Sequence, residues 1–496
     1  MAGLILAIDQ GTTNTKGLLV DSTGAPVFRT AAPVSLTTRY DGFVEQDPDA
    51  LWQSVLEVMS AAHSHVLCNG CSIEAVAISN QRETALAWDA DTGRAAAAAV
   101  SWQCGRGTSI CNRLSQQADI VRSATGLPLA PLVSASKWAW LIENDPAVQS
   151  LCTSGNLRLG TVDSWLVHKL TSHALHATDL TNASRTGLMD LSTLQWHPGL
   201  LDLFGIPANS MPALHCSSGD FDRCTGVNGF EGVPILAIIG DSHAALLGQG
   251  SFTPGVVKAT YGTGSSLMAL TAQLTADTPS LARTVAWSVA GETRFALEGN
   301  IAMTGAAIQW LGEFLSLTQP AADVAALAET VTDSNGVYFV PAMVGLGAPH
   351  WDAEARGAIS GLSRSHTSAH LARAALQAVA FQVADVFFEM ERASGLRFRE
   401  LRADGGATRN ASLMQFQADI LGRPVLRSVN EELSAIGAAW LAGIKLGWWK
   451  NLSALEAMKQ ETDRFDPSMD GFKHTRLYRG WQKAVESVRA SKEVTA

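Results

Sequence analysis

Three short turns rich in glycine and hydroxyl side chains interrupt the apolar segments of this 496-residue chain. They are Asp9-Gln-Gly-Thr-Thr-Asn-Thr-Lys16, Gly262-Thr-Gly-Ser265 and Asp404-Gly-Gly-Ala-Thr-Arg-Asn410. Turns of this composition offer backbone N–H and side-chain O–H donors to phosphate oxygens. A single turn of this kind could be an ordinary hairpin. Three of them, spread over both halves of the chain, favour a nucleotide site.

Features next to the first and third turns fit the same chemistry. Asp9 ends an apolar strand, and its carboxylate can help to hold a hydrated Mg²⁺ ion. The third turn contains two consecutive glycines and is followed by the start of a helix. The N-terminus of a helix favours a negatively charged ligand. The first turn lacks the Gly-Lys-Ser/Thr ending of a P-loop, and no Gly-x-Gly-x-x-Gly fingerprint follows the first strand. A nicotinamide cofactor is therefore disfavoured.

Arg82 and Glu83 indicate a site for a neutral, hydroxylated substrate. They lie in Asn80-Gln-Arg-Glu-Thr84, directly after the apolar residues 75–78. Residues just beyond the carboxyl end of a strand commonly line ligand crevices in α/β sheets. A guanidinium fork beside a carboxylate suits neighbouring hydroxyl groups. The alternative is a surface ion pair, worth at most about 1 kcal/mol.

Asp241 follows another apolar strand, residues 235–239, near the junction of the two halves of the chain. A general base between substrate and nucleotide would lie at such a junction. An aspartate after a glycine is also commonly a helix N-cap, and the two roles are compatible.

The order of the expected elements predicts an α/β fold. Strands at residues 4–8, 17–20 and 27–35 are followed by a helix from Pro48, with Asp47 as its N-cap, and by a strand at 73–79. A comparable order returns with strands at 256–261, 267–270, 284–289 and 295–298 and a helix at 303–314. We therefore expect two related halves in an α/β layer architecture.

Residues 368–394 form the clearest single helix in the sequence. Their apolar side chains cover most of the circumference, and Gly395 stands where a C-terminal cap is expected. This pattern is typical of a buried core helix.

Composition excludes several classes of protein. The chain has 46 acidic and 36 basic side chains, a net charge of −10, which argues against binding to nucleic acid or to an anionic membrane. Apolar stretches fall short of the ~20 residues that span a bilayer. The N-terminal apolar run has no basic residues before it and resembles a strand more than a signal peptide. Seven cysteines, an odd number, favour a reducing cytoplasm.

His63, His65, Cys68 and Cys71 form a string that superficially offers four zinc ligands. No second Cys-x-x-Cys or distant pair supports it. We expect helix-end packing there and no zinc.

Taken together, these segments resemble the FGGY carbohydrate kinases, and within them the glycerol kinase branch. The resemblance covers the chain up to about Trp449. The matching motifs, in the order of that family, include Ile8-Asp-Gln-Gly-Thr-Thr13, Ile78-Ser-Asn-Gln-Arg-Glu-Thr84, Ser101-Trp-Gln-Cys104, Thr181-Asn-Ala-Ser-Arg-Thr186, Gly240-Asp241, Thr260-Tyr-Gly-Thr-Gly264, Ala296-Leu-Glu-Gly299, Gly305-Ala-Ala-Ile-Gln-Trp-Leu311 and Asp404-Gly-Gly-Ala407.

The resemblance implies two actin-like, ribonuclease H-like ATPase domains, residues 1–240 and 241–496, with ATP and substrate in the interdomain cleft. By position, the phosphates of ATP would be held by Thr12, Thr13, Asn14, Lys16 and Thr263. Further nucleotide contacts would come from Gly305, Gln309, Gly406 and Asn410.

The same resemblance assigns the substrate side of the cleft. Arg82, Glu83, Asp241 and Ser242 would bind the hydroxyls of a polyol, and Trp102 would pack against its carbon backbone. Asp241 would take the proton of the attacking hydroxyl. Asp9 and Asp241 would hold Mg²⁺ through water. A homodimer or homotetramer is left open.

Several positions depart from the family pattern. Leu132 replaces a tyrosine of the glycerol pocket, Ser266 a phenylalanine, and Ser242 a glutamine. The arginine of a fructose-bisphosphate site has no counterpart in residues 229–235. We expect an enlarged pocket that binds glycerol weakly or prefers a four- or five-carbon polyol.

The predicted activity is ATP-dependent phosphorylation of a small polyol or sugar, with glycerol named first. The alternatives are a kinase of another polyol or ketose and, less favoured, an actin- or chaperone-type ATPase.

Overall fold

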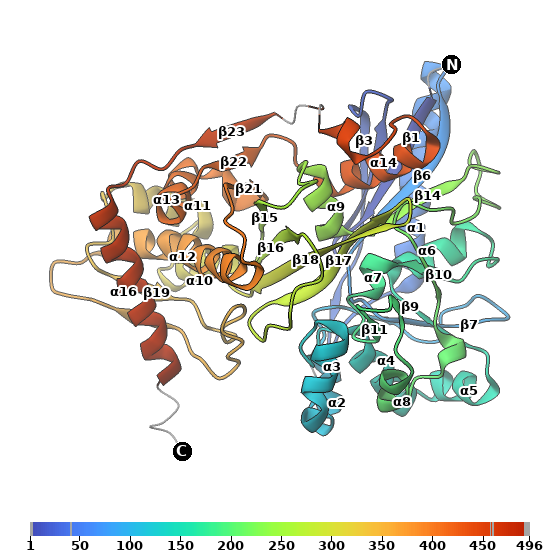
Figure 1. The fold of residues 1–496 in the computed structure, drawn as a ribbon, viewed down its shortest axis with the longest axis horizontal. Coiled ribbons are helices and arrows are strands. Elements are labelled where there is room, and N and C mark those ends of the chain that lie inside the picture. The colour runs from blue at the N-terminus through green and yellow to red at the C-terminus, as the bar shows by residue number, and fades with distance from the viewer. Residues whose placement is uncertain (1–2, 40–41, 457, 459–460, 491–496) are drawn as a thin grey trace.

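Figure 1 shows two lobes, and each half of the chain contributes one large twisted sheet. The structure is a computed structural model and describes residues 3–39, 42–456, 458 and 461–490. Residues coloured blue to green make up most of one lobe, and residues coloured orange to red make up most of the other.

The first sheet has five strands in the order β14-β6-β1-β2-β3. β1 pairs antiparallel with β2 and parallel with β6, which pairs parallel with β14. The strands are β1 (Gly3–Gln10), β2 (Asn14–Val20), β3 (Pro26–Pro33), β6 (Ser72–Asn80) and β14 (Ile235–Gly240).

The second sheet has seven strands in the order β17-β18-β16-β15-β21-β22-β23. β15 again pairs antiparallel with the strand that follows it and parallel with a later strand, β21. The strands are β15 (Val256–Tyr261), β16 (Ser265–Thr271), β17 (Ala282–Val289), β18 (Glu292–Ile301), β21 (Glu400–Asp404), β22 (Val425–Ser428) and β23 (Thr462–Phe465). This shared order confirms the expectation of two related α/β halves.

Helices cover the sheets, and short strands and turns connect them. The helices of eight or more residues are α1 (Pro48–Asn69), α3 (Ala118–Thr125), α4 (Ser134–Asn144), α5 (Pro146–Ser154), α6 (Val162–Leu170), α9 (Asp241–Gly248), α10 (Gly305–Phe314), α11 (Pro320–Glu329), α12 (Ser368–Ser394), α13 (Ala411–Leu421), α14 (Leu433–Leu446) and α16 (Gly471–Ala490). Shorter helices are α2 (Thr108–Arg113), α7 (Leu180–Ala183), α8 (Pro198–Phe204) and α15 (Leu452–Leu455). The 3-10 turns are η1 (Gly105–Gly107), η2 (Ser115–Gln117), η3 (Ala208–Ser210) and η4 (Gly406–Arg409). Small sheets use β4 (Thr37–Thr38), β5 (Val44–Gln46), β7 (Leu86–Asp89), β8 (Ala99–Val100), β9 (Leu157–Gly160), β10 (Ala177–Asp179), β11 (Met189–Asp190), β12 (Gln195–Trp196), β13 (Ala213–His215), β19 (Tyr338–Val340) and β20 (Ala358–Ser360).

Local sequence signals set the ends of α1 and α12 as expected. The Asp47 carboxylate accepts a hydrogen bond from the Asp49 amide at 2.9 Å, and Pro48 opens α1. Gly395 ends α12 in the left-handed conformation, with φ +67°.

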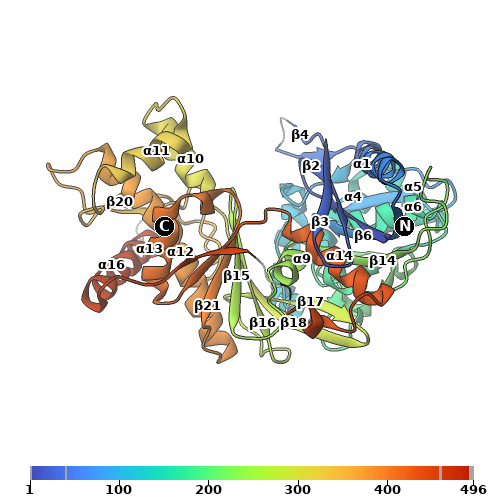
Figure 2. The ribbon, with the colours of Figure 1, turned by 90° about the horizontal axis from the view of Figure 1, so that it is seen from above.

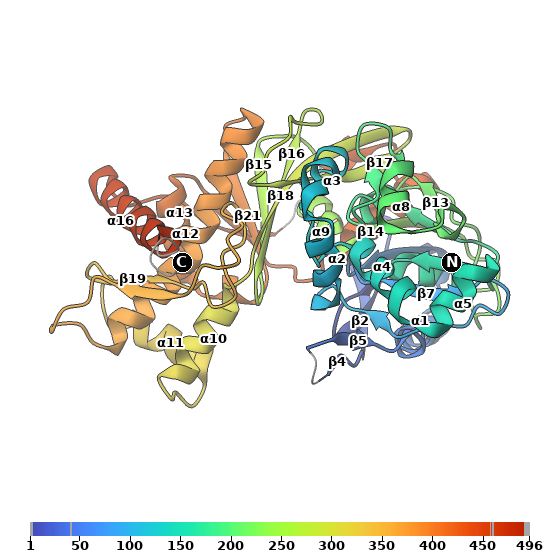
Figure 3. The same ribbon diagram turned by 90° about the horizontal axis from the view of Figure 1, so that it is seen from below.

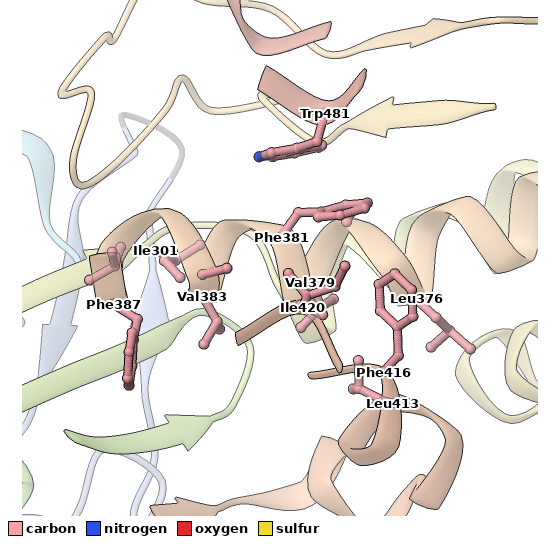
Figure 4. Packing of buried hydrophobic residues seen from close by; sticks show 14 of the residues in the cluster. Ile301, Leu376, Val379, Phe381, Val383, Phe387, Leu413, Phe416, Ile420 and Trp481 are labelled. Carbon is pink, nitrogen blue, oxygen red and sulfur yellow. The ribbon is translucent and has the colours of Figure 1, made fainter. Parts of the chain in front are cut away.

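The core of the second lobe is built around α12. Figure 4 shows Phe381 lying flat against Trp481, with ring centroids 5.3 Å apart, while Phe416 meets Phe381 edge-on. In the described part of the chain, α12 is the one helix long and apolar enough to cross a membrane, but 78% of its most apolar window is buried inside the fold. It is a core helix of this lobe.

Elements from the second half of the chain pack against the first sheet. α14 lies beside β1 and β6 (Figure 1), and the strands β15, β16 and β18 stand between the two lobes in Figures 2 and 3. One apolar cluster joins Ile5 and Ala77 of the first sheet to Trp287 of β17 and Trp440 of α14. The domain boundary at residue 240 stays a prediction.

Candidate active site

The carboxyl ends of the parallel strands bring the predicted chemistry together. Gln10 of β1 and Gly240 of β14 both pair with Asn80 of β6, so the residues that follow these strands share one edge of the first sheet. In the second sheet, Thr260 pairs with Asp404 in the same way.

A cavity of about 310 Å³ lies where these edges meet. Five of the predicted site residues line it: Asp9, Lys16, Asp241, Ser242 and Gly406. The other lining residues are Ala245, Lys258, Thr260, Asp404, Gly405, Arg409, Glu431, Leu433 and Ser434. A larger cavity of about 630 Å³, bordered by Asp119 and Arg283, contains none of the predicted site residues.

Four carboxylates line the 310 Å³ cavity, those of Asp9, Asp241, Asp404 and Glu431. Burial raises the pKa of Asp9 to about 6, and the nearby Asp241 carboxylate adds to this rise, although Ser79 donates a 2.8 Å hydrogen bond to Asp9. Burial also raises the pKa of Asp241, whereas the Arg82 guanidinium lowers it. The described residues contain no group of three or more potential metal ligands, but one or two carboxylates with waters and phosphates are a usual set for Mg²⁺. The donor set therefore fits a hydrated Mg²⁺ ion.

Asp241 is placed by the start of α9. Gly240 is the N-cap residue, and Asp241 is the first residue of the helix, where the helix dipole favours a negative charge. Its Oδ1 lies 3.1 Å from Nε of Arg82, and 38% of its side chain stays exposed. The carboxylate is therefore fixed by an ion pair and still accessible.

Arg82 and Glu83 belong to a buried network of four charges. Arg82 contacts Glu298 at 2.9 Å, and Arg185 contacts Glu298 at 3.0 Å and Glu83 at 2.6 Å. Glu298 is 0% exposed, and its two arginine neighbours hold the pKa of its carboxyl far below the ordinary value despite burial. The surface ion pair between Arg82 and Glu83 that we considered as an alternative is absent, because both side chains are buried and use other partners.

The backbone of Glu83 has a conformation that few side chains adopt, with φ +62°. Two buried donors hold its carbonyl oxygen: Oγ of Ser134 at 3.1 Å and Nζ of Lys137 at 3.3 Å. Lys137 is fully buried, and this burial lowers the pKa of its ammonium group to about 7. Ser134 and Lys137 thereby fix the Glu83 backbone, and Arg185 holds its carboxylate.

Replacing Lys137 tests this positioning role. In Lys137→Met, the Glu83 carbonyl keeps the Ser134 bond and loses one donor, and the Leu132 carbonyl loses its bond to Lys137. We expect the KM for the hydroxylated substrate predicted from the sequence to rise about tenfold, with kcat changed less than threefold. Steady-state kinetics at saturating ATP measure both constants. Ser134→Ala should change KM in the same direction. A fall in kcat with an unchanged KM would contradict the assignment.

The first turn is tied to Trp102. Nε1 of Trp102 donates to Oγ1 of Thr12 at 2.9 Å, and the indole is 38% exposed. Thr13 and Asn14 are exposed at the tip of the same turn, and their side chains bond each other at 3.2 Å. An indole face thus lies next to the predicted phosphate turn.

The second turn is joined to the start of α10. The Thr263 carbonyl accepts the amide of Ala306 at 3.0 Å, and the Gly305 amide donates to Gly262 at 3.0 Å. Gln309 lies one turn further along α10, where it donates to Glu313. The structure therefore groups Thr263, Gly305 and Gln309, but they do not line the 310 Å³ cavity.

The third turn approaches the second one closely. Gly405 has φ +95°, and a Cβ atom there would lie 2.5 Å from the Tyr261 carbonyl oxygen. Only glycine fits this position. Gly406 lines the cavity, whereas the Asn410 side chain caps α13 by accepting the Leu413 amide at 2.9 Å.

Four buried residues of this region were not singled out from the sequence. Arg185 and Glu298 lie within family motifs, Lys258 lies two residues before the motif that begins at Thr260, and Lys137 lies five residues after Leu132. A charged residue inside an apolar segment was the available signal, and it was strongest for Lys258 in Val256–Tyr261 and for Glu298 in Glu292–Ile301. The partners of these four residues lie in segments far away in the sequence, and the spacing of apolar residues along the chain does not identify such partners.

The His-Cys string lies at the end of α1 and just beyond it. His65 stacks on Phe28 with centroids 4.4 Å apart, His63 lies near Phe230, and Cys68 is exposed. The expectation that this string holds no zinc stays a prediction.

Comparison with known proteins decides the family. The family model for the N-terminal domain of the FGGY family of carbohydrate kinases matches residues 4–248, and the C-terminal model matches residues 257–446. The chain belongs to the FGGY family of carbohydrate kinases. It is an ATP-dependent carbohydrate kinase, as the sequence motifs predicted.

Relatives of this FGGY kinase match 98% of its length. It is 44% identical over 489 residues to a glycerol kinase of Burkholderia multivorans and 43% identical to one of Burkholderia vietnamiensis, in each case over 98% of both chains. The solved glycerol kinase of Plasmodium falciparum with ADP superimposes with a TM-score of 0.92 at 30% identity, covering 98% of each chain. A gluconate kinase of Lactobacillus acidophilus, with a TM-score of 0.90 at 22% identity and full coverage of both chains, shows the same fold. The predicted two-domain, actin-like architecture is confirmed.

Proposed function

We propose that this FGGY kinase transfers the terminal phosphate of ATP to a hydroxyl group of glycerol. The observation that carries the proposal is the Asp241 carboxylate, fixed by Arg82 and open to a cavity that the phosphate turns border. Full-length similarity to glycerol kinases supports glycerol as the acceptor.

In this proposal, Asp241 is the general base. The oxygen of one glycerol hydroxyl attacks the terminal phosphorus, and its proton passes to the Asp241 carboxylate. A new bond forms between oxygen and phosphorus while the bond to the bridging oxygen breaks, and ADP leaves with that oxygen. A raised pKa makes a carboxylate a better proton acceptor, and partial removal from water acts in this direction on Asp241 while the Arg82 guanidinium opposes it.

Residues around Asp241 orient the acceptor. Arg82 and Glu83 bind neighbouring hydroxyl groups, with Ser242 as a further hydroxyl partner, since Oγ of Ser242 already lies 3.3 Å from Arg82. Trp102 supplies an apolar face for the carbon backbone. Glu298 and Arg185 hold Arg82 and Glu83 in place through the buried network.

The nucleotide side uses the three turns. Thr12, Thr13, Asn14, Lys16 and Thr263 donate to the phosphates, and Gly305, Gln309, Gly406 and Asn410 surround the rest of the nucleotide. Asp9 and Asp241 would hold a hydrated Mg²⁺ ion. The ion, when bound, neutralises charge on the phosphates.

The cellular setting is part of the proposal. The net charge of −10 and seven free cysteines support a cytoplasmic enzyme that binds neither nucleic acid nor membranes. Whether the kinase forms a homodimer or homotetramer stays open.

A second candidate is a kinase of a longer polyol or a ketose. Leu132 and Ser266 favour it, because the resemblance places two aromatic rings at these positions in glycerol kinases. Ser266 is half-buried, and its hydroxyl lies 3.3 Å from Glu298 of the charge network. Loss of two rings beside this network would leave space for a larger acceptor.

A panel of polyols and sugars with ATP, read by coupled ADP release, tests both candidates. We expect glycerol to be phosphorylated with a KM about ten- to a hundredfold above that of Leu132→Tyr, because an unfilled pocket holds a three-carbon ligand weakly. If kcat/KM for glycerol exceeds that for every larger polyol by tenfold or more, the enlarged-pocket argument is wrong. No activity on any polyol would overturn the proposed function itself.

A further inference from the structure

Lys258 is a buried cation that the mechanism above leaves unused. It lies in β15, two residues before Thr260, and its side chain is fully buried. Both residues line the 310 Å³ cavity. In the part of the chain that the structure describes, its Nζ atom has no hydrogen-bond partner.

The other two cations that line this cavity already have partners. Lys16 pairs with Glu432 at 3.2 Å, and Arg409 pairs with Glu431 at 2.6 Å. Lys258 makes no ion pair within 4 Å among the described residues, so of the three lining cations it is the one without a protein counterion.

An ammonium group without a partner is costly to bury. Burial lowers the pKa of Lys258 and the Arg82 guanidinium acts in the same direction, whereas the Asp404 and Asp241 carboxylates act against it without forming an ion pair. The cavity thus holds an amino group to which no oxygen of the described residues is bound. An anionic ligand oxygen that enters the cavity would satisfy Nζ.

The position of Lys258 identifies which part of a nucleotide it would meet. Asp241 is among the carboxylates whose charge acts on Lys258, and the two residues line the same cavity. The phosphate that is transferred must lie beside Asp241, because the attacking hydroxyl loses its proton there. The rest of the nucleotide is assigned to Gly305, Gln309, Gly406 and Asn410, and of these four residues Gly406 alone lines this cavity.

We propose that Lys258 is a further catalytic residue, whose ammonium group donates to an oxygen of the terminal phosphate of ATP. This inference rests on the proposed function for the orientation of the nucleotide. Such a contact binds the phosphate in the ground state and stabilises the charge that spreads over its oxygens during transfer. The competing interpretation is a structural countercharge for Asp404, with no contact to the nucleotide.

Direct binding of nucleotides separates these interpretations without any acceptor present. For Lys258→Met, isothermal titration calorimetry should show AMP-PNP binding about ten- to a hundredfold weaker than in the wild type, with ADP weakened less than threefold. ADP lacks the terminal phosphate, and its binding also reports that the variant is folded. Lys445→Met, which removes an exposed lysine of α14, is the matched control and should bind both nucleotides like the wild type.

An equal loss for both nucleotides, or no loss for either, would overturn the proposal. If Lys258→Met does not fold, Lys258→Gln provides the same comparison with a donor but no charge. A crystal structure of the wild type with AMP-PNP needs no variant: Nζ of Lys258 should lie within about 3.2 Å of a terminal phosphate oxygen. A distance above about 5 Å to every phosphate oxygen would refute it. Failure of glycerol phosphorylation would refute the proposed function and leave this binding result intact.

Discussion

Asp241→Asn should lower kcat by about 10²–10⁴ and leave ATP binding within a fewfold of the wild type. The amide keeps the size of the side chain, but it cannot take the proton of the attacking hydroxyl. ATP affinity should change little, because the phosphates are bound mainly by the glycine-rich turns. Coupled ADP release measures kcat, and calorimetry with AMP-PNP measures nucleotide binding.

The control for this experiment is Asp202→Asn, which makes the same chemical change on the exposed face of α8. It should retain wild-type turnover. Turnover of Asp241→Asn close to that of the wild type would place the general base on another residue.

Glu298→Gln should lower the free energy of unfolding by about 3–5 kcal/mol, because it leaves two buried arginines without their shared carboxylate. Glu298 is 0% exposed and lies 2.9 Å from Arg82 and 3.0 Å from Arg185. Urea denaturation near pH 7 measures the difference. Glycerol binding should weaken as well, since Arg82 loses one of the groups that orient it.

The pH dependence gives this prediction a second test. The folded protein holds the pKa of Glu298 below its ordinary value of 4.5, so the stabilisation is present above that value and is lost as the pH falls below it. The difference between wild type and Glu298→Gln should therefore shrink at acid pH. Glu292→Gln is the matched control: its exposed pair with Arg294 should contribute at most about 1 kcal/mol. Equal effects of the two substitutions would show that the buried network does not stabilise the fold.

Local chemistry in the sequence was enough to predict the strands, the turns and most of the candidate site. The hairpin at Asp9, the cap at Asp47 and the end of α12 at Gly395 depend on neighbouring residues, and each forms where expected. The family motifs, read in order, also predicted the two-domain fold. These features depend on neighbouring residues and on fixed spacing between motifs. Both can be read directly from the amino-acid sequence, so the features could be predicted from it.

Only the tertiary structure decided which buried charged side chains pair with one another. Glu298 meets Arg82 across 216 positions in the chain, and Lys137 reaches the Glu83 carbonyl across 54. The lack of a counterion for Lys258 among the described residues became visible only when the partners of Lys16 and Arg409 were known. Electrostatic partners are selected by distance in space and by the loss of solvent, and neither quantity is set by local sequence. The sequence by itself thus determined the elements and the residues at their ends, whereas the packing of the two sheets determined which charges meet.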